Sequence, residues 1–106
     1  VQHGADAIVV SNHGGRQLDG AISAARALPA IMDRLAGCIP VMADGGVRSG
    51  LDVLRYVSLG AAAIMIGRPW VWGLGAGGQA GVAHVLQLLR AELETAMALT
   101  GRTRLA

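Results

Sequence analysis

The sequence contains no lysine and no phenylalanine, and it has only one cysteine and three aromatic residues in 106 positions. The single cysteine, Cys38, excludes an internal disulfide. No Cys/His spacing typical of a metal site surrounds it, so we expect no metal and a small, half-buried thiol. The positive charge comes from nine arginines that are spread along the chain. Without a basic cluster, and with few rings on which bases could stack, the sequence argues against nucleic-acid binding.

Long apolar segments are also absent. No run approaches the roughly 18 residues that span a bilayer, and no signal peptide is visible. The first residue is Val and not Met, so we expect the natural N-terminus to lie elsewhere, and targeting cannot be inferred. A composition of 53% hydrophobic and 15% charged residues predicts a folded chain. The length matches one small domain or part of a larger one.

Three short apolar runs predict strands that are buried on both faces, at residues 6–10, 39–43 and 62–66. Apolar residues at helical spacing follow each run. This alternation of strands and helices, joined by short turns, predicts a parallel sheet with right-handed crossovers and therefore an α/β fold.

Glycines and capping residues set the predicted limits of the helices. The first helix ends at Gly37, and Pro29 lies either in its first turn or at a kink. The second helix begins after Ser49, which has the spacing of a capping box, and ends at Gly60. The last helix has the clearest apolar stripe and is expected over residues 79–99.

Two architectures are compatible with this order of elements. One is a small free-standing α/β domain. The other is the C-terminal part of a (β/α)8 TIM barrel, comprising about three strands and their helices. Three parallel strands alone would expose two long edges and one apolar face. The unusual polar residues also all follow strand ends, which is the face where barrel enzymes carry their sites. Both observations favour the barrel.

The loops after the second and third strands share a combination of glycine and arginine. Gly45 and Gly46 let backbone amides approach a ligand, and Arg48 stands before a helix start, where the dipole and free amides favour an anion. Gly67 and Arg68 repeat this arrangement one strand later. Such a pair is typical of a phosphate site in a barrel. Ordinary tight turns with solvated arginines are the alternative.

Four polar side chains at these strand ends are candidates for chemistry. His13 follows the first strand and can titrate near neutrality, and Arg16 offers a planar fork for a carboxylate. A base beside a carboxylate clamp suits removal of a proton or hydride equivalent from the adjacent carbon. A polar surface loop is the alternative. Asp19 could orient Arg16 or cap the next helix. Asp44 could cap its own turn or accept hydrogen bonds from a cofactor's sugar or ribityl hydroxyls.

Three segments, SNHGGRQLDG, ADGGVRSGLDV and IGRPWVWGL, in this order and spacing, closely resemble the FMN-dependent α-hydroxy-acid dehydrogenase/oxidase family. The family includes glycolate oxidase, L-lactate dehydrogenase and mandelate dehydrogenase. The likeness extends over essentially all 106 residues, and the stretch LDGAISAARALPAI is most similar to bacterial L-lactate dehydrogenases. The first segment is highly specific, whereas DGGVR and GRP occur in other phosphate-binding barrels.

The resemblance implies that residues 1–106 form the C-terminal portion of a TIM barrel, with its sixth, seventh and eighth strands. It implies that His13 is the catalytic base and that His13 and Arg16 bind the substrate. It also implies a set of FMN-binding residues at the three strand ends. These are Ser11, Asp44, Gly45, Gly46, Val47, Arg48, Gly67 and Arg68.

The resemblance further implies oxidation of an L-2-hydroxy acid, most specifically L-lactate, to the 2-oxo acid. The electron acceptor is left open among a quinone, a cytochrome and oxygen. A homo-oligomer and a cytoplasmic location are expected for the full-length protein, with peripheral attachment to the inner membrane as an alternative. The family's lysine, and its substrate-binding tyrosines and aspartate from earlier strands, have no counterpart here, so the isolated chain is expected to be inactive. Another phosphate-binding barrel enzyme and a non-catalytic anion-binding α/β module are the competing interpretations.

Overall fold

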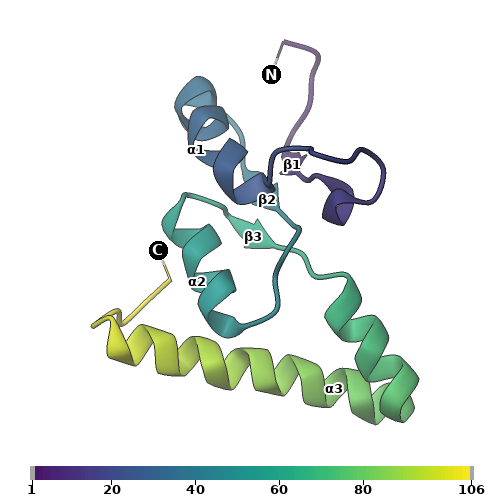
Figure 1. Ribbon diagram of the computed structural model, residues 1–106. Helices are drawn as coiled ribbons and strands as arrows, with labels where there is room; N and C mark the ends of the chain where they lie inside the picture. Colours follow the sequence, from purple (N-terminus) through teal and green to yellow (C-terminus); the bar gives the residue numbers. More distant parts are fainter. Residues whose placement is uncertain (1, 106) are drawn as a thin grey trace.

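The computed structural model describes residues 2–105 and shows strands and helices alternating along them. The predicted order of elements is confirmed, although each strand is shorter than the apolar run that predicted it. Figure 1 shows the strands at the centre, with α1 and α2 to their left and α3 below them. In chain order the elements are β1 (Ile8–Val10), the 3₁₀ turn η1 (His13–Gly15), α1 (Ala24–Leu35), β2 (Val41–Ala43), α2 (Gly50–Ser58), β3 (Ala63–Ile64) and α3 (Arg68–Leu99).

The strands form one parallel sheet in the order β1-β2-β3. Side chains alternate between the faces of a strand, and one face packs on α1 and α2 through a core that includes Leu28, Val41 and Ala43. The other face has no such cover within residues 2–105, because Val9 is 43% exposed and Met65 is 45% exposed. Parallel sheets are normally covered on both faces. The half-covered sheet therefore favours part of a larger barrel over a free-standing domain.

Helix α1 starts earlier than Pro29 suggested. Ser23 is its N-cap, and the Ser23 hydroxyl accepts a hydrogen bond from the Arg26 amide at 3.3 Å. Pro29 therefore lies in the second turn, and its placement in the first turn is wrong. The helix ends where Ala36 adopts a left-handed conformation with φ of 48°, followed by Gly37 with φ of 78°, so the predicted stop is confirmed.

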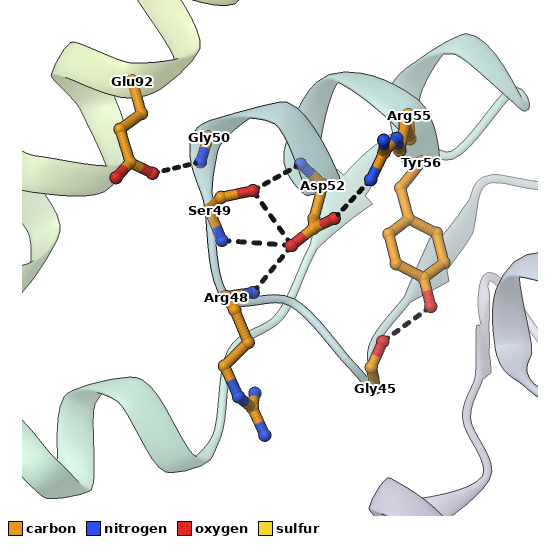
Figure 2. A network of polar contacts seen from close by, with 8 residues as sticks. All are labelled: Gly45, Arg48, Ser49, Gly50, Asp52, Arg55, Tyr56 and Glu92. Atoms are coloured by element: carbon orange, nitrogen blue, oxygen red, sulfur yellow. Dashed lines mark hydrogen bonds and ion pairs between the residues drawn. The ribbon is translucent and has the colours of Figure 1, made fainter.

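Helix α2 begins with the predicted capping box. The Ser49 hydroxyl accepts from the Asp52 amide at 3.2 Å, and the Asp52 carboxylate accepts from the amides of Arg48 and Ser49 at 3.0 and 3.1 Å. Helix α3 adds a second carboxylate, because Glu92 accepts from the Gly50 amide at 2.9 Å (Figure 2). Two carboxylates therefore occupy the first turn of α2, where they complement the helix dipole.

The Asp52 network predicts a stability that depends on pH. Burial alone would raise the pKa of Asp52. Hydrogen bonds from the Arg48 amide, from Ser49 and from Arg55 lower it by more than burial raises it, so the pKa lies below its ordinary value of 3.8. A lowered folded-state pKa contributes stability above the unfolded value, and this contribution is lost as the pH falls through the folded value. We expect Asp52→Asn to cost about 1 kcal/mol of unfolding free energy at neutral pH.

Urea unfolding of the full-length protein across the acidic range measures this effect. The Asp52→Asn variant should lose less stability than the wild type as the pH falls below 3.8. Asp33→Asn, at an exposed position of α1, is the matched control and should behave as the wild type. Equal pH dependence of Asp52→Asn and the wild type would contradict the assignment.

Helix α3 consists of two helical segments separated by a break. Gly77 and Gly78 have non-helical conformations, with φ of −155° and 58°, so the long segment starts where the sequence predicted. The two segments touch through glycine, because a Cβ on Gly73 would lie 2.7 Å from the Gly81 carbonyl oxygen. No helix among residues 2–105 is long and apolar enough to cross a membrane.

Candidate functional site

The loops that follow the three strands meet in one cleft of about 230 Å³. Strands in a parallel sheet end at the same edge, so their following loops emerge together. Every predicted site residue except Ser11 lines this cleft. The lining residues are His13, Gly14, Arg16, Asp44, Gly45, Gly46, Val47, Arg48, Met65, Ile66, Gly67, Arg68 and Val71.

Ser11 lies next to the cleft and supports the turn that carries His13. Its hydroxyl accepts a hydrogen bond from the His13 amide at 3.0 Å. The structure therefore gives Ser11 a local role at the start of η1. Its contact with a cofactor stays a prediction.

The backbone at His13 adopts a conformation that is rare for a residue with a side chain. His13 has φ of 53°, and the next two residues continue in the same region, with φ of 66° at Gly14 and 73° at Gly15. A left-handed non-glycine residue costs about 1 kcal/mol or more and persists where its surroundings hold it. Here the Ser11 hydroxyl and the two glycines permit the turn, which brings the imidazole to the cleft.

Arg16 lines the cleft without help from Asp19. The Asp19 carboxylate accepts from the Gly20 amide at 3.0 Å, and no ion pair joins Asp19 to Arg16 within residues 2–105. Helix α1 is capped by Ser23. Both interpretations of Asp19 are therefore wrong, and the exposed Arg16 guanidinium is left for a ligand.

Asp44 presents an unsatisfied acceptor. Its Oδ1 atom is buried and has no hydrogen-bond partner among the described residues, although the residue lines the cleft. Leaving such an atom unpaired costs about 1–3 kcal/mol. A ligand hydroxyl in the cleft would satisfy it, so the orphaned oxygen favours the second interpretation of Asp44, as an acceptor for sugar or ribityl hydroxyls.

The turn after Asp44 requires glycine. Gly45 and Gly46 have φ of 94° and 75°, and a Cβ on Gly45 would lie 2.9 Å from the Asn12 side-chain oxygen. The amides of these two glycines make no hydrogen bond to another residue of the range 2–105. They are available as donors to a ligand, as the glycine pair predicted.

The start of α2 is not the anion site that the sequence suggested. The expectation of free amides next to Arg48 is wrong, because carboxylates from Asp52 and Glu92 already accept from the amides of Arg48, Ser49 and Gly50. Arg48 contributes its side chain instead. Its guanidinium donates to the Val47 carbonyl at 2.7 Å and stacks 5.0 Å from the centre of the Trp72 ring.

The start of α3, unlike that of α2, keeps a backbone amide free for an anion. Gly67 is its N-cap and makes no side-chain capping bond, and Pro69 lies in the first turn. The amide of Gly67 has no partner among residues 2–105. Arg68 donates to the Gly14 carbonyl at 3.3 Å, which ties the third loop to the first. This helix start, with its guanidinium, therefore suits an anion.

The sequence analysis missed several residues that lie in or beside the cleft. Met65, Ile66 and Val71 line the cleft, yet they look like ordinary strand and helix residues. Trp72 contacts Arg48 because the short first segment of α3 places its ring beside the guanidinium. Val71 stands three positions after Arg68 in α3, so helical spacing from Arg68 could have placed it near the cleft, but nothing local pairs Trp72 with Arg48.

Elsewhere, Cys38 is exposed, so the expectation of a half-buried thiol is wrong. It directly follows the glycine that ends α1, where the chain is open to solvent. His3 and His84 are exposed, in line with a surface role.

Comparison with known proteins identifies close relatives. A family model described as FMN-dependent dehydrogenase matches residues 1–106. An L-lactate dehydrogenase of Xanthomonas campestris pv. campestris is 59% identical over 101 residues, which cover 95% of this chain and 26% of the relative. An L-lactate oxidase of Nostoc sp. is 56% identical over 105 residues, which cover 99% of this chain and 29% of the relative.

Solved structures give the same result. A mandelate oxidase mutant with the monooxide FMN adduct superposes with a TM-score of 0.91 at 50% identity, over 95% of this chain and 32% of that protein. Mandelate oxidase with benzoyl-formic acid gives a TM-score of 0.91 and 50% identity, over 95% of this chain and 30% of that protein. The chain thus spans a third or less of the length of each of these relatives.

These matches confirm the resemblance carried by the three loops, and they confirm the fold class as part of a TIM barrel. The numbering of the strands as sixth to eighth stays a prediction. The roles of the individual site residues also stay predictions.

Proposed function

Because the chain belongs to the FMN-dependent dehydrogenase family, we propose that its full-length protein oxidises an L-2-hydroxy acid, L-lactate, to the 2-oxo acid. One observation carries the proposal. His13, Arg16 and the two glycine–arginine loops, which come from three separate stretches of the sequence, line a single cleft. Relatives named L-lactate dehydrogenase and L-lactate oxidase support lactate as the substrate.

Two residues of the first loop act on the substrate in this proposal. Arg16 binds the carboxylate through its guanidinium fork, which fixes the orientation of the neighbouring hydroxyl-bearing carbon. His13 takes up a proton that the substrate loses on oxidation. His13 and Arg16 belong to the same loop and both line the cleft.

The other two loops hold the cofactor. Asp44 accepts hydrogen bonds from ribityl hydroxyls through its unpaired oxygen, and the amides of Gly45 and Gly46 are free to donate. Arg48 and Arg68, with Gly67 at the start of α3, bind the phosphate. FMN held by these residues would supply the two-electron acceptor that the oxidation requires. Val47 belongs to the buried core and also lines the cleft, so it anchors the loop after β2.

The remaining expectations extend the same proposal. We propose a homo-oligomer in the cytoplasm, with peripheral attachment to the inner membrane as the alternative. The electron acceptor is a quinone, a cytochrome or oxygen. Absorbance of an added quinone, compared with oxygen uptake under the same conditions, distinguishes a dehydrogenase from an oxidase.

Anaerobic reduction of the flavin tests the proposed reaction. We expect the purified full-length protein to carry FMN, and its visible absorption to bleach on addition of L-lactate, with pyruvate formed in equal amount. D-Lactate is the matched control and should leave the spectrum unchanged. Mandelate is the second compound to test, because the similar solved structures are of mandelate oxidase. Faster bleaching by mandelate than by L-lactate would contradict the choice of substrate, and a protein without flavin would contradict the proposal as a whole.

A further inference from the structure

Tyr56 stands behind the loop that carries Asp44 and the glycine pair. It lies on α2 and is 5% exposed, and it does not line the cleft. Its hydroxyl lies 2.7 Å from the Gly45 carbonyl oxygen and 3.2 Å from the Asp44 carbonyl oxygen. Figure 2 shows the ring reaching from the helix to the loop. The phenol thus contacts two successive peptide groups of the glycine turn.

These contacts fix the direction of the free amides. In a planar trans peptide, the C=O and the following N–H point in opposite directions. The carbonyls of Asp44 and Gly45 turn toward Tyr56, so the amides of Gly45 and Gly46 turn away from it. Those two amides have no hydrogen-bond partner within residues 2–105, and both glycines line the cleft. Tyr56 therefore holds two donors in place for a ligand.

The glycine turn needs such support because glycine restricts the backbone conformation very little. Gly45 and Gly46 both have positive φ, where glycine is free to move through many conformations. A buried hydroxyl whose single proton is shared between the Gly45 and Asp44 carbonyls lowers this freedom before a ligand arrives, so less ordering entropy is lost on binding. Burial and the nearby Asp44 charge raise the pKa of Tyr56, which keeps its hydroxyl protonated as a donor.

We propose that Tyr56 is a positioning residue for cofactor binding, whose hydroxyl aims the amides of Gly45 and Gly46 into the cleft. This role rests on the proposed function, because it assigns the cleft to FMN. It adds a residue from the body of a helix to a site otherwise built from loops. Tyr56 acts through the backbone and touches neither substrate nor cofactor.

The test compares FMN affinity in variants of the full-length protein that lack one hydroxyl. Tyr56→Phe keeps the ring and removes the hydrogen bonds. We expect the FMN dissociation constant, measured by fluorescence titration of the apoprotein, to rise about tenfold. At saturating FMN, the KM for L-lactate should be unchanged, because Tyr56 contacts neither His13 nor Arg16.

Ser58→Ala is the matched control. It removes a hydroxyl from the same helix, where Ser58 donates to the Leu54 carbonyl at 2.7 Å, and it lies outside the cleft. Its FMN affinity should equal that of the wild type. An unchanged affinity in Tyr56→Phe overturns the proposal, as does an equal loss in both variants. If Tyr56→Phe does not fold, Tyr56→Met removes the same hydroxyl with a flexible apolar side chain.

The outcome is separable from that of the proposed function. A wild-type protein that binds FMN but is not reduced by L-lactate refutes the reaction, and the comparison of FMN affinities still decides the role of Tyr56. Conversely, bleaching by L-lactate with equal affinities in wild type and Tyr56→Phe refutes only the positioning role.

Discussion

Replacing His13 with Gln is expected to slow reduction of the bound flavin by L-lactate about 1,000-fold, since general-base catalysis contributes on the order of 10²–10⁴-fold. Gln keeps a polar side chain of similar size but cannot take up the proton. FMN affinity should be unchanged, because the ribityl and phosphate groups of the cofactor are assigned to the other two loops. Stopped-flow absorbance under anaerobic conditions measures the reduction, and titration of the apoprotein measures the affinity.

A second variant is needed to control for the left-handed backbone conformation of His13. Any replacement with a side chain must adopt φ near 53°, and a disturbed turn would also slow the reaction. Asn tolerates this region better than most residues, so His13→Asn separates loss of the base from loss of the turn. Both variants should be equally slow. His84→Gln, at an exposed position of α3, should react as the wild type. Reduction at the normal rate in His13→Gln would show that another group is the base.

Replacing Gly50 with Ala is expected to lower the unfolding free energy of the full-length protein by about 3 kcal/mol, at the upper end of the usual cost of overpacking. A Cβ at this position would overlap the backbone of α3 at Leu93 and lie 2.5 Å from the Leu89 carbonyl oxygen. Backbone atoms cannot rotate away as a side-chain end can. The two helices must separate, and the hydrogen bond from the Gly50 amide to Glu92 is then weakened as well.

Gly75→Ala is the matched control for this change. Gly75 lies within α3, and a Cβ there would meet no atom within 4 Å in the described part of the chain. Alanine is the better helix former, so this variant should gain about 0.5–1 kcal/mol. Urea unfolding of both variants measures the difference. Equal stability of Gly50→Ala and the wild type would show that α2 and α3 tolerate a wider separation than the structure has.

Local patterns in the sequence predicted much of the fold. The apolar runs located all three strands, and the spacing of Ser49 and Asp52 predicted the capping box that the structure contains. These features depend on neighbouring residues, so a short window holds the information. The strand-end rule for parallel sheets then predicted that the three loops meet, and the cleft lined by His13, Asp44 and Arg68 agrees with it.

Contacts between distant residues could not be predicted in this way. Glu92 accepts from the Gly50 amide across 42 positions of sequence, so the local spacing of Ser49 and Asp52 indicated only part of the occupation of this helix start. Tyr56 looked like an ordinary helical residue until the fold placed its hydroxyl against Gly45. In both cases the deciding partner comes from packing between elements, which periodicity does not encode.

The cleft brings three exposed guanidinium groups, from Arg16, Arg48 and Arg68, to one opening, whereas the whole chain has a formal charge of only +2. The three guanidinium groups outnumber the one carboxylate of the lining, Asp44, and such an excess of positive charge draws anionic ligands from solution and increases the rate of encounter. Both proposed ligands, a carboxylate and a phosphate, are anions. At physiological ionic strength the attraction extends about 8 Å. Capture of substrate and cofactor from solution therefore becomes slower as salt is added, even where the contacts inside the cleft are unchanged.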